Sequence, residues 1–114
     1  MNRETLIAAG IDYDQGVERF AGRAALYEKY LKKLFDDDIM GTFTQQLRAG
    51  DMNAAFRAAH DLKGLTGNLA IHDLFRAISA LVEALRRGDS QENIKRIYEY
   101  ALSLYETAET AVRA

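Results

Sequence analysis

The chain has 114 residues, of which 48% are apolar, and this length and composition fit one folded domain with one core. Its 15 Lys and Arg residues against 17 Asp and Glu residues give a formal net charge of −2, which argues against a nucleic-acid-binding protein. Cysteine is absent, so disulfides, thiolate-bound zinc and thiol catalysis are excluded. Proline is also absent, and alanine and leucine far outnumber valine, a mixture that predicts an all-α protein.

The first 22 residues predict a short N-terminal annex of two helices. The segment Arg3–Ala9 has the length of one or two helical turns and ends at Gly10. We expect Asp14 to cap a second short helix that runs to about Phe20, before Gly22 closes it. The expected apolar contacts of this second helix are Ile11, Val17 and Phe20.

From Arg23 onward apolar residues recur at helical spacing, but the phase of the pattern slips once. The first part of the stripe is Leu26, Tyr27, Tyr30, Leu31, Leu34 and Phe35, and the part after the slip is Ile39, Phe43 and Leu47. The slip falls at Asp36-Asp37-Asp38, where we predict a kink or a break. We interpret these three acidic residues as a solvated turn with one Asp capping the next segment, rather than as a cation site.

Two later connections share the pattern L-R-x-G-D, at residues 47–51 and 85–89. Gly50 and Gly88 suit the left-handed position that ends a helix, and Asp51 and Asp89 suit the N-cap that starts the next one. Asp89 also has Glu92 three residues later, as in a capping box. An internal duplication and the needs of a tight helical hairpin explain the repeated pattern equally well.

Three longer helices are predicted around these connections, at about Met52–Gly67, Ile71–Arg87 and Ser90–Val112. The apolar face of the second is Ile71, Leu74, Phe75, Ile78, Leu81, Val82 and Leu85, and the last buries Ile94, Ile97, Tyr98, Ala101, Tyr105, Ala108 and Val112. Connections of two to four residues force successive helices to pack antiparallel. We therefore expect an up-and-down four-helix bundle over about residues 23–113, within a single domain of residues 1–114.

The helix at Met52–Gly67 carries a histidine at the edge of its solvent face. Its predicted buried stripe is Met52, Ala55, Ala59, Leu62, Thr66 and Leu69. At about 100° per residue, His60 lies about 110° from the centre of that stripe. Gly64 and Gly67 follow on the same side, although a helix-interior glycine costs about 1 kcal/mol relative to alanine. Glycines there leave the imidazole open to another protein, while close helix packing is the alternative interpretation.

An imidazole is largely neutral near pH 7, and its free nitrogen is a nucleophile that can accept a phosphoryl group and later release it. Such a group needs nearby positive charge. Lys63, three residues after His60, can supply it, and Arg57, three residues before, is a possible auxiliary cation. The other histidine, His72, is interpreted as a surface or capping residue. No Glu stands three residues before either histidine, which excludes the Glu-x-x-His pairs of di-metal bundles.

Residues 58–70 read A-A-H-D-L-K-G-L-T-G-N-L-A and resemble the signature of the histidine phosphotransfer (HPt) family, roughly A-H-x-L-K-G-x-x-x-N-L-G. The matching residues are Ala59, His60, Leu62, Lys63, Gly64, Asn68 and Leu69. The bundle architecture and the G-I-D segment at residues 10–12 also fit this family. Three residues depart from its pattern: Ala70 replaces the usual glycine, Leu65 replaces a commonly small residue, and Asp61 adds negative charge beside the histidine.

The resemblance implies that His60 is the phosphoacceptor, generally at the outward-facing Nε2, that Lys63 orients the phosphate and that Gly64 gives clearance to a docking partner. The implied partners are a response-regulator receiver domain or a hybrid sensor histidine kinase in a two-component phosphorelay. No cofactor is expected on this chain, and Mg²⁺ is expected only on the partner receiver domain. The alternative function is a non-phosphorylated helical adaptor that binds receiver or kinase domains.

The sequence carries no nucleotide-binding signature, so we expect a carrier without ATP-dependent kinase activity. Residues 1–10 lack the apolar run of a signal peptide, and no segment approaches the roughly 20 apolar residues of a membrane span. We therefore expect a cytoplasmic protein, and we also expect it to be a monomer. The initial Met1 and the lack of linker residues favour a free-standing protein, but a domain excised from a hybrid kinase would look similar.

Overall fold

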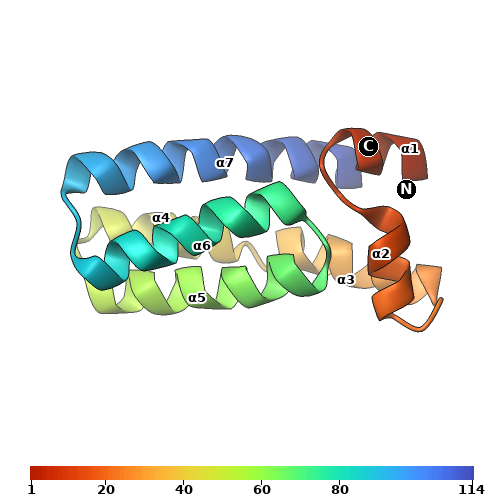
Figure 1. Ribbon diagram of the computed structural model, residues 1–114, viewed down its shortest axis with the longest axis horizontal. Helices are drawn as coiled ribbons and strands as arrows, with labels where there is room; N and C mark the ends of the chain where they lie inside the picture. The colour runs from red at the N-terminus through yellow and green to blue at the C-terminus, as the bar shows by residue number, and fades with distance from the viewer.

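The computed structural model describes residues 1–114 as seven α-helices without strands. They are α1 (Arg3–Ala8), α2 (Tyr13–Arg19), α3 (Ala24–Asp36), α4 (Ile39–Arg48), α5 (Met52–Asn68), α6 (His72–Arg87) and α7 (Gln91–Arg113). Helices α3 and α4 follow one another along one side of the molecule, and α5, α6 and α7 run alternately up and down beside them (Figure 1). The predicted all-α, up-and-down bundle with short N-terminal helices is confirmed. None of the helices combines the length and apolarity needed to cross a bilayer.

The acidic run at residues 36–38 breaks the first bundle helix in two. Helix α3 ends at Asp36, and Asp38 adopts a left-handed backbone conformation with φ of 50°. The Asp38 side chain then accepts a hydrogen bond from the backbone N–H of Gly41 (3.1 Å) and caps α4. The predicted break, with one aspartate as the next N-cap, is confirmed.

The hairpin ahead of α5 forms as the L-R-x-G-D pattern predicts. Gly50 has a φ of 75°, and the Asp51 side chain caps α5 by accepting from the N–H of Ala54 (3.1 Å). Because this cap fixes where α5 begins, it also fixes which residues of α5 face the core.

Two other capping predictions are wrong. The N-cap of α2 is Asp12, while Asp14 lies in the first turn of that helix and pairs with Arg3 (2.6 Å). At the α6–α7 connection Gly88 ends α6 with a φ of 68°, as predicted, but Ser90 rather than Asp89 caps α7. In both places two good capping residues stand close together, and the chain's path selects between them.

A continuous apolar core fills the bundle, and α5 contributes mainly alanines to it. Ala55 and Ala59 are fully buried, and Ala54 and Ala58 nearly so, with Leu62 as the large side chain of this helix in the core. Small side chains let α5 lie close to both α4 and α6. The prediction that Met52 belongs to this buried stripe is wrong, because Met52 is the first residue of α5, at the end of the bundle, and is 41% exposed.

The annex and α3 together hold the turn between α5 and α6. The buried Tyr27 hydroxyl donates to the carbonyl of Leu69 (2.7 Å), and the Asp12 N–H donates to the carbonyl of Ala70 (2.9 Å). The Asp12 carboxylate also contacts Nε2 of His72, the first residue of α6, at 3.0 Å. Ala70, which stands where the HPt signature has glycine, is buried with a φ of 60°, so this turn uses the left-handed conformation even without glycine.

Candidate functional site

Helix α5 presents His60 on its outward face, near the middle of the bundle. His60 is exposed, while Ala59 and Leu62 on either side of it in sequence are fully buried. The helical wheel predicts this exposure, and the structure has it. The imidazole makes no hydrogen bond and no ion pair with another residue of the chain, so both of its nitrogens are free to meet a partner.

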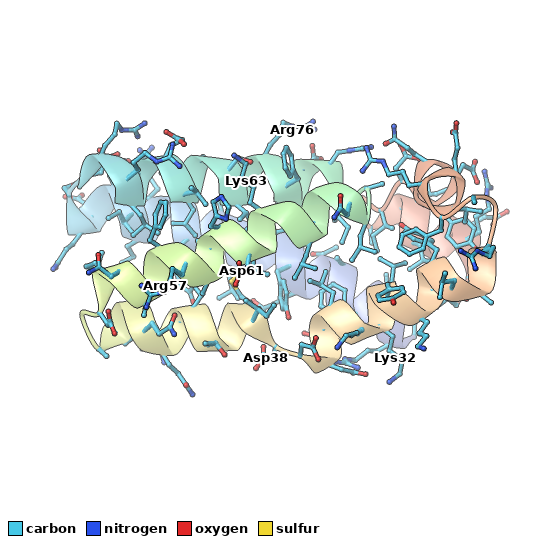
Figure 2. All side chains as sticks on the ribbon, turned by 90° about the horizontal axis from the view of Figure 1, so that it is seen from below. Lys32, Asp38, Arg57, Asp61, Lys63 and Arg76 are labelled. Carbon is cyan, nitrogen blue, oxygen red and sulfur yellow. The ribbon has the colours of Figure 1, made fainter.

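Two cationic side chains of α5 stand on opposite sides of the histidine. Figure 2 shows Lys63 on the side of α5 that faces α6, and Arg57 and Asp61 on the side that faces α4. Lys63 is half-buried and Arg57 is exposed. Neither takes part in any of the ion pairs of the protein, which join other residues. Their charges are therefore not neutralised by a carboxylate before an anion arrives.

The two glycines after His60 occupy different surroundings. A Cβ added at Gly64 would meet no heavy atom within 4 Å, so the surface beside the imidazole is open there. A Cβ at Gly67 would lie 3.0 Å from the ring of Phe75 in α6. The clearance assigned to Gly67 therefore needs correction: its missing side chain lets α5 and α6 pack closely, which was the alternative interpretation. Clearance for a partner stays a prediction for Gly64.

A shallow hollow beside the imidazole joins α5 to α6. Its lining residues are His60, Lys63, Gly64, Gly67, Asn68 and Phe75. A much more apolar hollow lies between α3 and the end of α5, and Asn68 lines both of them. The hollow at His60 is open, and three polar side chains line it, so it suits a small anionic group brought by another molecule better than an enclosed ligand.

Sequence reasoning missed two side chains near the histidine. The ring of Phe56 lies 6.2 Å from the imidazole, centroid to centroid, and the guanidinium of Arg86 from α6 stands 5.6 Å from the Phe56 ring centroid. Phe56 precedes His60 by one helical turn, so its spacing was an available signal. Arg86 was not predictable, because its place beside α5 depends on how α6 aligns with that helix.

No group of three or more His, Asp and Glu side chains converges in a way that could hold a metal ion. Burial raises the pKa of the Tyr27 phenol, and the Lys32 and Arg113 side chains lower the pKa of the Asp36 carboxyl. The chemistry open to the site is therefore that of an exposed imidazole nucleophile with unpaired cations beside it.

These features define a class of protein: an antiparallel helical bundle that exposes one histidine, flanked by cations, on a face open to another macromolecule. The Hpt domain family model matches residues 26–111, which is most of the chain, and the protein belongs to this family. Hpt domains are phosphocarrier modules rather than kinases, and they act in two-component signalling through receiver and kinase domains. Searches among curated proteins and among solved structures found no match to this chain.

Proposed function

We propose that this protein is a phosphoryl carrier of a two-component phosphorelay, which accepts a phosphoryl group on His60 and exchanges it with the aspartate of a receiver domain. The observation that carries the proposal is an exposed imidazole without a protein partner, placed between Lys63 and Arg57, in a chain of the Hpt family. Neither cation is committed to a carboxylate, and both can attract the phosphoryl oxygens.

The transfer is a displacement at phosphorus. The lone pair of the His60 Nε2 attacks the phosphorus atom of the receiver's aspartyl phosphate, and a P–N bond forms. The P–O bond to the aspartate breaks, and its electron pair leaves with the carboxylate. The ring then carries a positive charge until the Nδ1 proton passes to solvent, and return transfer reverses these steps. We propose that any Mg²⁺ needed for the transfer is bound by the receiver domain.

The first test needs no natural partner. Phosphoramidate, a small phosphoryl donor, should label the wild-type protein with acid-labile phosphate, and His60→Gln should carry no label. His72→Gln is the matched control and should be labelled like the wild type, because His72 already contacts Asp12. His60→Gln should melt close to the wild type, since exposed substitutions typically change the free energy of unfolding by within about 0.5 kcal/mol.

Acid-labile label on His60→Gln at the wild-type rate would contradict the assignment. A protein that binds a receiver domain tightly but is never labelled on His60, by phosphoramidate or by a phosphorylated receiver, would instead be the helical adaptor.

A further inference from the structure

A cation of α6, Arg86, lies over the aromatic ring that neighbours the histidine. The Arg86 guanidinium lies 5.6 Å from the centroid of the Phe56 ring, a typical cation–π separation. The same ring lies 6.2 Å from the imidazole of His60, with the two ring planes 33° apart. Phe56 is thus the one side chain that lies beside both the imidazole and this guanidinium.

The alignment of α5 and α6 makes this position specific. The helices run antiparallel, with Phe75 opposite Gly67 at one end and Arg86 opposite Phe56 at the other. His60 lies between these two contacts. Arg86 therefore lies toward the N-terminal end of α5 from the histidine, whereas Lys63 stands on the C-terminal side.

Arg86 also has a counter-ion that it can give up. Its Nη1 donates to the Glu83 carboxylate at 2.9 Å, and the two side chains are 55% and 44% exposed. An exposed carboxylate–guanidinium pair contributes little to stability. A phosphoryl dianion offers more charge and three acceptor oxygens to the planar guanidinium fork, so it competes well with a single carboxylate.

Building on the proposed function, we propose that Arg86 binds the phosphoryl group of the phosphorylated protein. Its guanidinium breaks the ion pair with Glu83 and contacts the phosphoryl group on His60, while the Phe56 ring supports the arginine side chain. The charged side chains around that phosphoryl group are then Lys63, Arg57 and Arg86, opposed by Glu83 and Asp61. Arg86 lies 26 residues from His60 in the sequence, outside the signature motif around the histidine.

The test measures the protonation of the phosphoryl group itself. Proteins are phosphorylated on His60 with phosphoramidate, and the ³¹P resonance of phosphohistidine is followed against pH. A nearby cation favours the dianion, so Arg86→Gln should raise the apparent pKa of the phosphoryl group by about half a unit, roughly a threefold change in its proton affinity. Arg86→Lys should restore part of the difference. Arg87→Gln, the matched control, removes the next arginine of α6, which pairs with Asp89 instead.

One further variant and one further measurement separate binding by Arg86 from a general charge effect. Phe56→Leu keeps the arginine but removes the aromatic ring against which it packs. This variant should shift the phosphoryl pKa in the same direction as Arg86→Gln. The side-chain Nε–H resonance of Arg86, but not that of Arg87, should move when wild-type His60 is phosphorylated.

Coincident ³¹P titrations for wild type, Arg86→Gln and Arg87→Gln would overturn the role of Arg86 while leaving His60 as the acceptor. Absence of any phosphohistidine signal at His60 in the wild type would instead overturn the proposed function, so the two failures are distinguishable.

Discussion

Three glycines inside helices differ in what an added methyl group would meet. At Gly16 it would collide with the buried ring of Tyr27, at Gly67 it would press on Phe75, and at Gly64 it would meet open space. The first two glycines are thus explained by packing alone. Packing does not explain Gly64, and a glycine inside a helix lowers the stability of the helix relative to alanine. We propose that Gly64 instead leaves room for a partner that docks beside His60.

A bulky side chain at position 64 should therefore slow phosphoryl transfer only from a large donor such as a receiver domain. Gly64→Gln should slow phosphotransfer from a receiver domain sharply and leave labelling by phosphoramidate unchanged, because the small donor needs no docking surface. Gly64→Ala should keep both reactions and stabilise the protein by up to about 1 kcal/mol in urea denaturation. Asp61→Gln, an exposed neighbour, controls for a new glutamine. Equal transfer rates for Gly64→Gln and wild type would show that the partner approaches from another side.

The charge of Lys63 should act on the phosphorylated state more than on binding. Lys63→Ala should slow phosphotransfer, or shift its equilibrium, by roughly tenfold, which corresponds to about 1.4 kcal/mol. Affinity for the unphosphorylated receiver should change much less, because one charge at a rim contributes modestly. Lys63→Arg should retain more function than Lys63→Gln, and Arg57→Ala should have the smaller effect of an auxiliary cation. An adaptor would show the reverse, with weakened binding and no phosphate-dependent difference.

For single residues, helical periodicity predicts which side chains face outward better than it predicts which residues of other helices lie beside them. The periodicity of α5 places His60 outward correctly, because a helix fixes the angle between its own residues. It misplaces Met52 and misjudges Gly67, because exposure at a helix end and contact with α6 depend on other elements. The same limit hides Arg86, whose separation from His60 in sequence carries no information about distance in space.

Two connections between helices contain an alanine with a strained backbone conformation. Ala21 and Ala70 both adopt left-handed backbone conformations, with φ of 56° and 60°. A residue with a Cβ typically costs about 1–2 kcal/mol in this region relative to glycine. Ala21 is exposed, next to Gly22, whereas Ala70 is fully buried in the turn between α5 and α6.

The two alanines should therefore respond differently to the same substitution. Ala21→Gly should stabilise the protein by about 1 kcal/mol, because it relieves strain and removes no buried surface. Ala70→Gly relieves the same strain but exposes space left by a buried methyl group, worth about 0.8 kcal/mol, so its net effect should be near zero. Paired urea titrations measure the difference. Stabilisation by Ala70→Gly that exceeds that by Ala21→Gly would contradict this account.

Some helix boundaries could be predicted from local sequence, and others depend on tertiary contacts. The break between α3 and α4 and the N-cap of α4 at residues 36–38 were predictable, because a slip in the phase of the apolar pattern and a run of aspartates coincide there. The caps of α2 and α7 were not, because Asp12 competes with Asp14 and Ser90 with Asp89, and all four are good capping residues. Which of them caps is decided by the tertiary path, such as the hydrogen bond from Asp12 to Ala70.

Across the whole molecule, one ion-pair cluster ties the first bundle helix to the last. Asp36 at the end of α3 accepts from Lys32 (2.7 Å) and from Arg113 of α7 (2.9 Å), and these two partners lower its pKa. The contacts of residue 36 with residue 113 could not be read from the sequence, although the antiparallel bundle that brings them together was predicted from helix periodicity and short connections. The hydrogen bonds between the annex and the α5–α6 turn were missed for the same reason.

The Asp36 cluster should make stability depend on acid pH. A carboxyl whose folded pKa is depressed adds stability that is fully present above its ordinary pKa of 3.8 and is lost as pH falls through the lower folded value. Between neutral pH and about pH 3, the wild-type melting temperature should therefore fall further than that of Asp36→Asn. Glu92→Gln, an exposed acidic residue in α7 without an ion pair, is the control. Parallel losses for Asp36→Asn and wild type would remove this contribution.

The packing of α1 against α7 brings the two chain ends to the same tip of an elongated molecule, 41 Å in its longest dimension (Figure 1). His60 lies eight residues before the end of α5, about 12 Å along the helix from that end, and the annex lies beyond it. A short peptide joining Ala114 to Met1 would close the chain into a ring without crossing the histidine face. New ends opened at the exposed Gly88 connection would then lie at the opposite tip. The face that carries His60 thus stays open wherever the polypeptide starts and stops, and we expect the same bundle to keep that face open when it is inserted into, or appended to, another chain.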